Sequence, residues 1–338
     1  MYREQIQFSN YDMEAVKILE DFLPENIFDA HAHLFDSDYM QGVPTLENKR
    51  VVCGLEEYLQ TCGKMLANPK RLQLNIISYP ERSMADMESE NCKKADAFLV
   101  KQLSKDASNV GEIIVRPGES VEGLKKRLVH PGIRGVKCYH VLASKEDTWN
   151  CNIEEYLPES AWQLAQERGM YITLHMVKDK ALADPHNREY VCTMAKKYPN
   201  ATLILAHAAR SFAAWTGIES VEWVAHLENV CFDFSAVCES PAMIQIIKKV
   251  GIKRCMWGSD YPIAQARGKA ISLGNGFYWI YENDIAQFSS KTPIENWLIG
   301  LENLMAVRQA CMLSDCNRSD IEDLFYNNAV RLLTKKEG

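Results

Sequence analysis

Eight short hydrophobic stretches, separated by amphipathic stretches, recur along the chain. Each has the length and the apolar or alternating pattern of a buried β-strand. They are Ile27–His33, Leu72–Ser78, Glu112–Arg116, Gly135–His140, Tyr171–Met176, Thr202–His207, Val230–Ser235 and Arg254–Asp260. Helix signals lie between them, such as the N-cap and first-turn pair at Asp184 and Pro185 and the helix stop at Gly169. The order of strand and helix is therefore repeated through the chain.

This repeated order predicts an α/β fold built as a closed parallel barrel. Parallel neighbours need a crossover of a dozen or more residues, which the intervening helices supply. An open doubly wound sheet is the alternative, but no GxGxxG motif follows the first strand, and polar residues lie at the ends of many strands. We expect a single (β/α)₈ TIM-barrel domain over 1–338, with a core at about 26–262 and a C-terminal loop and helices at 263–335.

Further segments fall outside the repeat. The stretch Tyr11–Phe22 predicts a helix that closes the bottom of the barrel, and two more helices are expected at Ile294–Leu313 and Ser319–Leu333. Long stretches rich in Gly and Pro follow the first and the eighth strands, at Phe35–Arg50 and Pro262–Pro293. Loops of this length on the catalytic face of a barrel are candidate lids.

Composition narrows the class of protein. Of the 338 residues, 47% are hydrophobic and 25% are charged, which favours an ordinary globular protein over a disordered one. The formal net charge is −7 and no long basic run occurs, so we expect no nucleic-acid partner. No apolar run is long enough for a membrane span or a signal peptide. The 11 cysteines lack a close CxxC pair, which indicates reduced thiols and a cytoplasmic location.

The strongest chemical signal is a pair of histidines at the end of the first predicted strand. His31 and His33 are two residues apart, so both imidazoles point to the same face, into the barrel. His175 ends the fifth strand and His207 ends the sixth. A single histidine is more often structural than a ligand, but the pairing and the repeated position at strand ends favour a metal site.

Asp260 completes this set of side chains. It ends the eighth strand after a Gly and a Ser, where an unpaired carboxylate in an apolar segment would be costly, although a turn aspartate is the alternative. Four imidazoles and one carboxylate at the same end of four strands suit Zn²⁺, Mn²⁺ or Fe²⁺. We expect one divalent metal ion, Zn²⁺ first, and a reaction that uses a metal-activated water.

The motifs around these residues resemble the amidohydrolase superfamily of metal-dependent (β/α)₈ barrels. The order HxH, His, His and Asp at strands one, five, six and eight is typical of it. Three motifs, DAHAHLF at Asp29–Phe35, MWGSDYP at Met256–Pro262 and DIEDLFYNNAVRLL at Asp320–Leu333, are similar to the amidohydrolase-related (amidohydrolase 2) branch. That branch includes lactonases and aromatic-acid or semialdehyde decarboxylases. The resemblance spans roughly Phe28–Leu333.

The resemblance implies a role for each strand-end residue. His31, His33 and His175 would bind one metal together with Asp260, and His207 would lie beside it. Asp260 would take a proton from the water and pass it to the leaving group. His207 would polarise the substrate carbonyl or orient the nucleophile. Both roles are chemically sound, since a carboxylate next to the water is a positioned base and an imidazole can stabilise a developing oxyanion.

Further polar residues at strand ends are candidates for substrate binding. Lys137 leaves the metal count open, because binuclear members of the superfamily bridge two metals with a carboxylated lysine on this strand. We favour one metal, with Lys137 as an anion contact or in a salt bridge. Arg210 and Arg116 suit bidentate binding of a carboxylate. With His140 and Tyr261 they indicate an acidic or polyhydroxylated substrate, and a surface ion pair is the alternative for each arginine.

These expectations lead to three functional hypotheses. The first is a metal-dependent hydrolase of a small anionic or sugar-acid-like lactone, ester or amide. The second is a metal-dependent nonoxidative decarboxylase of an aromatic or unsaturated carboxylic acid, and the third is an inactive barrel that acts as a binding protein. Relatives often carry glycines after the sixth-strand histidine, where this chain has Ala208, Ala209 and Arg210, so substrate specificity is not transferred. Association into a homo-oligomer stays open.

Overall fold

A curled sheet of mostly parallel strands forms the centre of the molecule. The computed structural model describes residues 7–40, 50–288 and 294–334. Within these ranges the sheet has nine strands in the order β2-β1-β3-β4-β5-β6-β7-β8-β9, and only the β1–β2 pair is antiparallel. The strands are β1 (Asn26–Asp36), β2 (Val52–Cys53), β3 (Arg71–Ser78), β4 (Val110–Ile114), β5 (Ile133–Cys138), β6 (Tyr171–Leu174), β7 (Thr202–Leu205), β8 (Val230–Asp233) and β9 (Cys255–Met256). All eight predicted strands are therefore confirmed.

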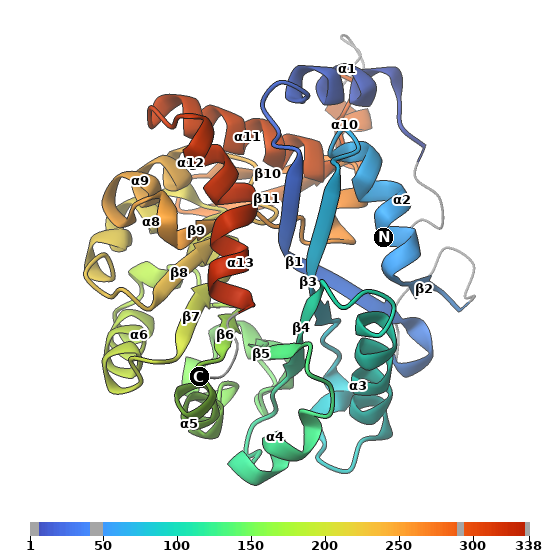
Figure 1. Cartoon of the computed structure of the whole chain (residues 1–338). Coiled ribbons are helices and arrows are strands. Elements are labelled where there is room, and N and C mark those ends of the chain that lie inside the picture. Colours follow the sequence, from blue (N-terminus) through green and yellow to red (C-terminus); the bar gives the residue numbers. More distant parts are fainter. Residues whose placement is uncertain (1–6, 41–49, 289–293, 335–338) are drawn as a thin grey trace.

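Helices follow the strands and surround the outer face of the sheet (Figure 1). They are α1 (Asn10–Leu19), α2 (Leu55–Met65), α3 (Glu90–Leu103), α4 (Val121–Arg127), α5 (Glu159–Arg168), α6 (Pro185–Lys197), α7 (Ala206–Arg210), α8 (Ala214–Ser220), α9 (Pro241–Val250), α10 (Glu282–Phe288), α11 (Ile299–Leu313), α12 (Arg318–Glu322) and α13 (Asn328–Leu333). The predicted helix signals act as expected. Asp184 caps α6 through its carboxylate, and Gly169 ends α5 with φ 62°.

The sheet curls until the segment that follows its last strand lies beside β1. Three backbone hydrogen bonds connect them, from Ala30 N to Trp257 O (3.0 Å), from Asp260 N to His31 O (2.8 Å) and from His33 N to Tyr261 O (2.8 Å). Since β9 ends at Met256, all three bonds are made by the irregular segment that follows it. The segment 257–261 and the first strand are thus neighbours.

The C-terminal helix α13 covers the interior of the curled sheet at the amino ends of its strands. Ala329 and Leu332 of this helix pack in one buried cluster with Phe28 of β1 and Tyr171 of β6. The helix predicted at Tyr11–Phe22 forms as α1, but it packs against α11 instead of closing the interior. Ala329, Leu332 and Leu333 of α13 are buried in this cluster and fill this end of the sheet, so α1 is not needed there.

The segment after β9 is more ordered than the predicted loop. It forms the hairpin β10 (Gly268–Leu273) and β11 (Gly276–Tyr281), followed by α10. The aromatic run of β11 suits a strand, which outweighs the glycines around it. The predicted loop Phe35–Arg50 begins with the end of β1 and a 3₁₀ turn at Ser37–Tyr39, whereas its residues 41–49, like 289–293 of the second predicted loop, lie outside the described residues.

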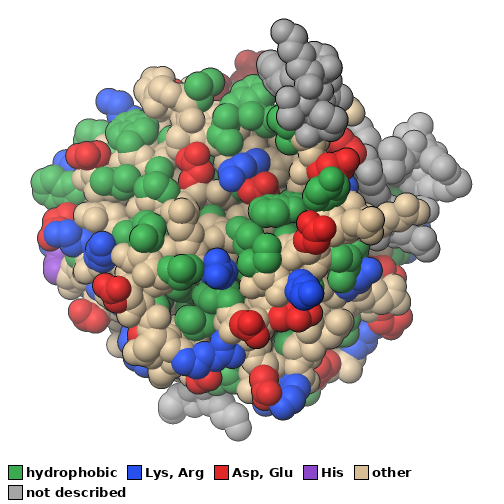
Figure 2. Space-filling view, turned by 90° about the horizontal axis from the view of Figure 1, so that it is seen from above, with side chains coloured by type: hydrophobic (Ala, Val, Ile, Leu, Met, Phe, Trp, Pro, Cys, Tyr) green, Lys and Arg blue, Asp and Glu red, His purple; other side chains and the backbone are tan. Residues whose placement is uncertain are grey.

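The surface and the thiols agree with the composition. Figure 2 shows hydrophobic, acidic and basic side chains interspersed over the face that it presents. All eleven cysteines lie in the described residues and are free thiols, most of them buried. Among the helices of the described part of the chain, none combines the length and the apolar character needed to cross a membrane.

Candidate active site

The five strand-end residues predicted as the site meet at the carboxyl ends of the parallel strands. His31 and His33 lie on β1, His175 follows directly after β6, and His207 lies two residues after the end of β7, in α7. Asp260 lies in the segment after β9 that is hydrogen-bonded to β1. All five are buried, with exposed fractions of 7% or less. The structure therefore places these five side chains at one edge of the sheet, and their roles stay predictions.

Three of the imidazoles are oriented through their Nδ1 atoms. His31 Nδ1 lies 3.0 Å from Asp233 Oδ2, His33 Nδ1 lies 3.3 Å from the Ser78 carbonyl oxygen, and His207 Nδ1 lies 3.1 Å from the Ser235 carbonyl oxygen. Each of these oxygens accepts a hydrogen bond, so each Nδ1 carries the proton and Nε2 keeps its lone pair. Histidines that bind metals are held in the same way by carboxylates or backbone carbonyls.

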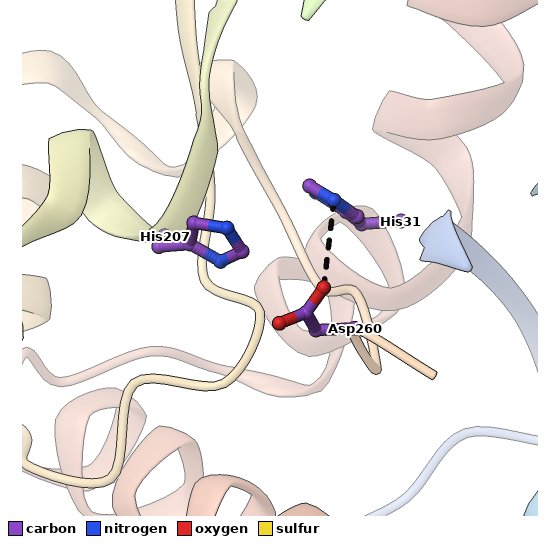
Figure 3. Close-up of side chains that lie close together, drawn as sticks. All are labelled: His31, His207 and Asp260. Carbon is purple, nitrogen blue, oxygen red and sulfur yellow. Dashed lines mark ion pairs between the residues drawn. The ribbon is translucent and has the colours of Figure 1, made fainter. Parts of the chain in front are cut away.

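The Nε2 atoms of His31 and His33 converge with the carboxylate of Asp260. His31 Nε2 and His33 Nε2 are 3.3 Å apart, and Asp260 Oδ1 lies 3.6 Å from both. Ligand atoms of His31, His207 and Asp260 all lie within 4.8 Å of one another, and Figure 3 shows these side chains pointing toward one another. Groups that only accept hydrogen bonds do not stabilise each other at such distances, whereas a cation among them does. The donor set therefore fits a divalent metal ion.

Lys137 places an amino group next to this cluster. Its Nζ lies 3.2 Å from His31 Nε2, and the side chain is fully buried on β5. Burial lowers the pKa of Lys137, against the carboxylates of Glu112 and Asp233, which raise it. Within the described residues no carboxylate forms a salt bridge with Lys137. The structure therefore does not show the salt bridge that the sequence left open as one alternative for Lys137.

His175 differs from the other imidazoles because neither ring nitrogen has a partner. Both nitrogens are buried, and the ring packs against Tyr139 and His207 at centroid distances of 4.3 and 5.1 Å. A buried polar atom without a partner is costly, and a metal or a ligand would satisfy it. The close three-residue group contains His207 and not His175, which differs from the ligand set implied by the resemblance.

Burial controls the protonation of the site. It lowers the pKa values of His31, His33 and His175 well below the usual range, and that of His207 to about 3. The four imidazoles are therefore neutral near pH 7, as metal binding requires. Burial raises the pKa of Asp260 to about 7, with Lys137 acting in the opposite direction.

The turn that holds His207 has a left-handed backbone. His207, Ala208, Ala209 and Arg210 have φ values of 56°, 53°, 59° and 60°. Glycine adopts this conformation without strain, whereas residues with a Cβ adopt it at a cost. The glycines noted in relatives at these positions suit this turn, and this chain forms it with side chains present. The turn also directs Arg210 and His207 toward the same cavity.

A cavity of about 170 Å³ lies in front of the imidazoles, and aromatic side chains form much of its wall. Of the five residues predicted to bind substrate, Arg210 lines it. Arg116 does not, because its guanidinium is bound to Glu119 at 2.8 Å and to backbone carbonyls. The ion-pair alternative therefore describes Arg116.

The other three predicted residues lie behind the cavity wall. Lys137 is inside the sheet, as described above. His140 lies 3.0 Å from Thr148 Oγ1 through Nδ1 and packs against Trp149. Tyr261 is fully buried with its ring against Tyr58. The lining does not include these three side chains.

Sequence reasoning missed three buried carboxylates. Asp233 holds His31 and also accepts from the backbone N–H of His207 at 3.1 Å. Asp29 accepts from the N–H groups of His31 and Ser259, and Glu112 lies deeper in the sheet. Each carboxylate interrupts an apolar strand, which is the same signal that identified Asp260. The sequence gives this signal but does not say which partner each carboxylate meets.

Buried imidazoles and a carboxylate at the carboxyl edge of a curled parallel sheet, beside a cavity, define an α/β protein with a candidate metal centre of the kind found in enzymes. The chain belongs to the amidohydrolase family, whose model matches residues 28–335. This confirms the family expected from the sequence motifs. No curated protein matches the sequence.

Solved structures of low sequence identity share the fold. A protein from Pseudomonas putida, described as a 2-pyrone-4,6-dicarboxylic acid hydrolase, is 17% identical with a TM-score of 0.56 over 92% of this chain and 98% of that chain. An amidohydrolase from Burkholderia multivorans, solved with bound zinc, is 13% identical with a TM-score of 0.55 over 91% and 99%. The 5-carboxyvanillate decarboxylase from Novosphingobium aromaticivorans, solved with manganese and 4-hydroxy-3-methoxy-5-nitrobenzoic acid, is 12% identical with a TM-score of 0.57 over 99% and 100%. These structural relatives are thus hydrolases and a decarboxylase.

Proposed function

We propose that the chain is a metal-dependent hydrolase of small anionic substrates, built as a single domain with a closed (β/α)₈ barrel. The backbone hydrogen bonds between β1 and the segment 257–261 support closure, since they join the two ends of the eight-strand parallel series. The observation that carries the function is the orientation of His31, His33 and His207. Their Nδ1 atoms donate hydrogen bonds to fixed oxygens. The Nε2 atoms of His31 and His33 lie 3.6 Å from Asp260 Oδ1, and His207 belongs to the same close group.

The proposed ligands of one divalent ion are His31, His33, His175 and Asp260. The two unpartnered nitrogens of His175 support its place in this set, and His207, which belongs to the close group, is the alternative fourth donor. Zinc is the first candidate and manganese or iron the next, because all three accept imidazole together with carboxylate. Such an ion, when bound, lowers the pKa of a water molecule and polarises a substrate carbonyl.

The side chains around the donor set supply the other steps of hydrolysis. Asp260 is the carboxylate nearest the convergent lone pairs, which suits it to take a proton from the attacking water and deliver it to the leaving group. His207 borders the same cavity and would donate to, or orient, the carbonyl oxygen. Arg210 would bind the anionic group of the substrate.

Decarboxylation is the second candidate function, because the same donors can hold a carboxylate or an adjacent hydroxyl. The aromatic wall of the cavity suits an aromatic acid as the substrate of such a decarboxylase. One of the structural relatives is a decarboxylase with manganese bound. Product analysis separates the two functions, since release of CO₂ from a carboxylic acid would show that the enzyme is a decarboxylase and not a hydrolase.

Metal content tests the proposal directly. We expect about one equivalent of divalent metal in protein purified without chelator, and its loss in the His31→Ala/His33→Ala variant. His186→Ala is a matched control, because His186 is exposed and pairs with Glu154. About two equivalents would instead indicate a binuclear centre that includes Lys137. Absence of metal, even after addition of Zn²⁺ or Mn²⁺, would refute the proposal in favour of an inactive barrel.

A further inference from the structure

The hairpin after β9 forms one wall of the cavity with a row of aromatic rings. Side chains along a strand alternate between its two faces. Phe277, Trp279 and Tyr281 of β11 therefore share one face, and all three line the cavity. Tyr278, between them, points away and is 56% exposed. A single strand thus presents three flat surfaces to the site.

This aromatic wall is held in place from outside the site. The Trp215 indole N–H donates to the Asn275 carbonyl oxygen at 3.1 Å, which ties the hairpin turn to α8. The Ala214 backbone N–H donates to Ser272 Oγ at 3.1 Å, and the Ser272 N–H donates to Glu239 at the same distance. The wall is therefore preformed, and substrate does not have to order it.

Arg210 lies at one end of this wall between two aromatic faces. Its guanidinium is 5.2 Å from the centre of the Phe277 ring and 5.5 Å from that of Trp149. One N–H donates to the Lys178 carbonyl oxygen at 3.0 Å, and no carboxylate of the described residues forms an ion pair with it. A cation that is largely buried and lacks an anion is costly, so a bound carboxylate would complete its surroundings.

Further aromatic rings complete the lining of the cavity. Tyr79, Tyr139 and Phe212 belong to the same lining, and the Phe212 ring is 5.2 Å from that of Trp279. Aromatic rings attract other flat rings in stacked or edge-to-face arrangements beyond the burial of area. A saturated ring or a sugar acid of the same charge would gain only the burial, and its hydroxyl groups would meet mostly ring carbon.

We propose that Phe277 and Trp279 are specificity-determining residues which, with Arg210, make this site select flat, conjugated carboxylic acids over saturated ones. The inference rests on the proposed function for the location of the substrate, and it narrows the substrate class. Trp279 and Phe277 provide the ring surface, and Arg210 binds the carboxylate. The hairpin lies outside the motifs that define the metal centre, so it can set the substrate without changing the chemistry.

Binding of two matched probes tests this proposal. Benzoate and cyclohexanecarboxylate have the same charge and similar size, but only benzoate is flat. By calorimetric titration of the metal-loaded protein, we expect benzoate to bind roughly two- to tenfold more tightly. Trp279→Leu should abolish this ratio, and Tyr278→Leu, on the outer face of the same strand, should keep it. Arg210→Gln should weaken both probes by a similar factor.

Three outcomes would overturn the proposal: equal affinity for the two probes, an unchanged ratio in Trp279→Leu, or binding of neither probe at millimolar concentration. Trp279→Phe, which keeps a ring, should retain part of the preference and guards against a folding defect in the leucine variant. The titration requires no turnover. Selective binding by a protein without hydrolytic activity would therefore refute the proposed function alone, and an active protein without selectivity would refute this inference alone.

Discussion

The left-handed turn after β7 predicts an unusual response to glycine at Ala208. This residue is fully buried and has φ 53°. An Ala→Gly change in a buried, regular position loses about 0.8 kcal/mol of methyl burial and about 0.5–1 kcal/mol through the freer unfolded chain. At Ala208 the change also relieves a left-handed conformation that costs about 1–2 kcal/mol for a residue with a Cβ. We expect Ala208→Gly to change the free energy of unfolding by less than about 1 kcal/mol.

Ala165→Gly provides the matched control. Ala165 is equally buried but lies within the right-handed helix α5, so its replacement relieves no strain. We expect this variant to lose about 1.5–2 kcal/mol. Urea unfolding of both variants, stripped of metal and followed by circular dichroism, gives the comparison. Losses of equal size in the two variants would show that the turn stores no strain and would refute the reasoning.

Two further predictions concern the buried carboxylates. Burial raises the pKa of Glu112 to about 7, so the folded state keeps a proton that the unfolded state loses above about pH 4.5. The free energy of unfolding should therefore fall by up to about 1.4 kcal/mol per pH unit between about pH 4.5 and pH 7. Glu112→Gln should remove this part of the pH dependence of the urea midpoint, and an equally steep slope in the variant would contradict the assignment. Asp233→Asn takes the carboxylate from His31 Nδ1 and should weaken metal binding about 10- to 100-fold in competition with a chromophoric chelator, whereas unchanged affinity would exclude this orienting role.

The sequence predicted the repeating part of the fold because hydrophobic patterning decides it. Buried parallel strands are apolar on both faces, and all eight stretches stand out as such. The hairpin β10–β11 was missed because Gly268, Gly274 and Gly276 indicate a loop. The aromatic-rich run from Phe277 to Tyr281 instead forms a strand. The role of α13 was missed because its position depends on packing between segments far apart in the chain.

The sequence predicted which strand ends lie together but not the contacts of the side chains there. Strand-end position identified the histidines and Asp260, since parallel strands place their carboxyl ends together. Arg116 and Arg210 have similar positions in the pattern, yet the first meets Glu119 and the second faces the cavity. The partner of Arg116 lies only three residues away in the sequence. The cavity that Arg210 faces is instead formed by segments far apart in the chain, which the local sequence does not show.

The contact between β1 and the segment after β9 sets the order in which the site can be completed. His31 and His33 are made early in synthesis, whereas Asp260 and the backbone groups that bind β1 come more than 200 residues later. A chain that ends before this segment carries the paired imidazoles without their carboxylate. If the proposed metal ion binds there, its high-affinity binding would require that this segment has already met β1. The bound ion would then stabilise the contact between them, so that loss of the metal and separation of the segment from β1 would be coupled.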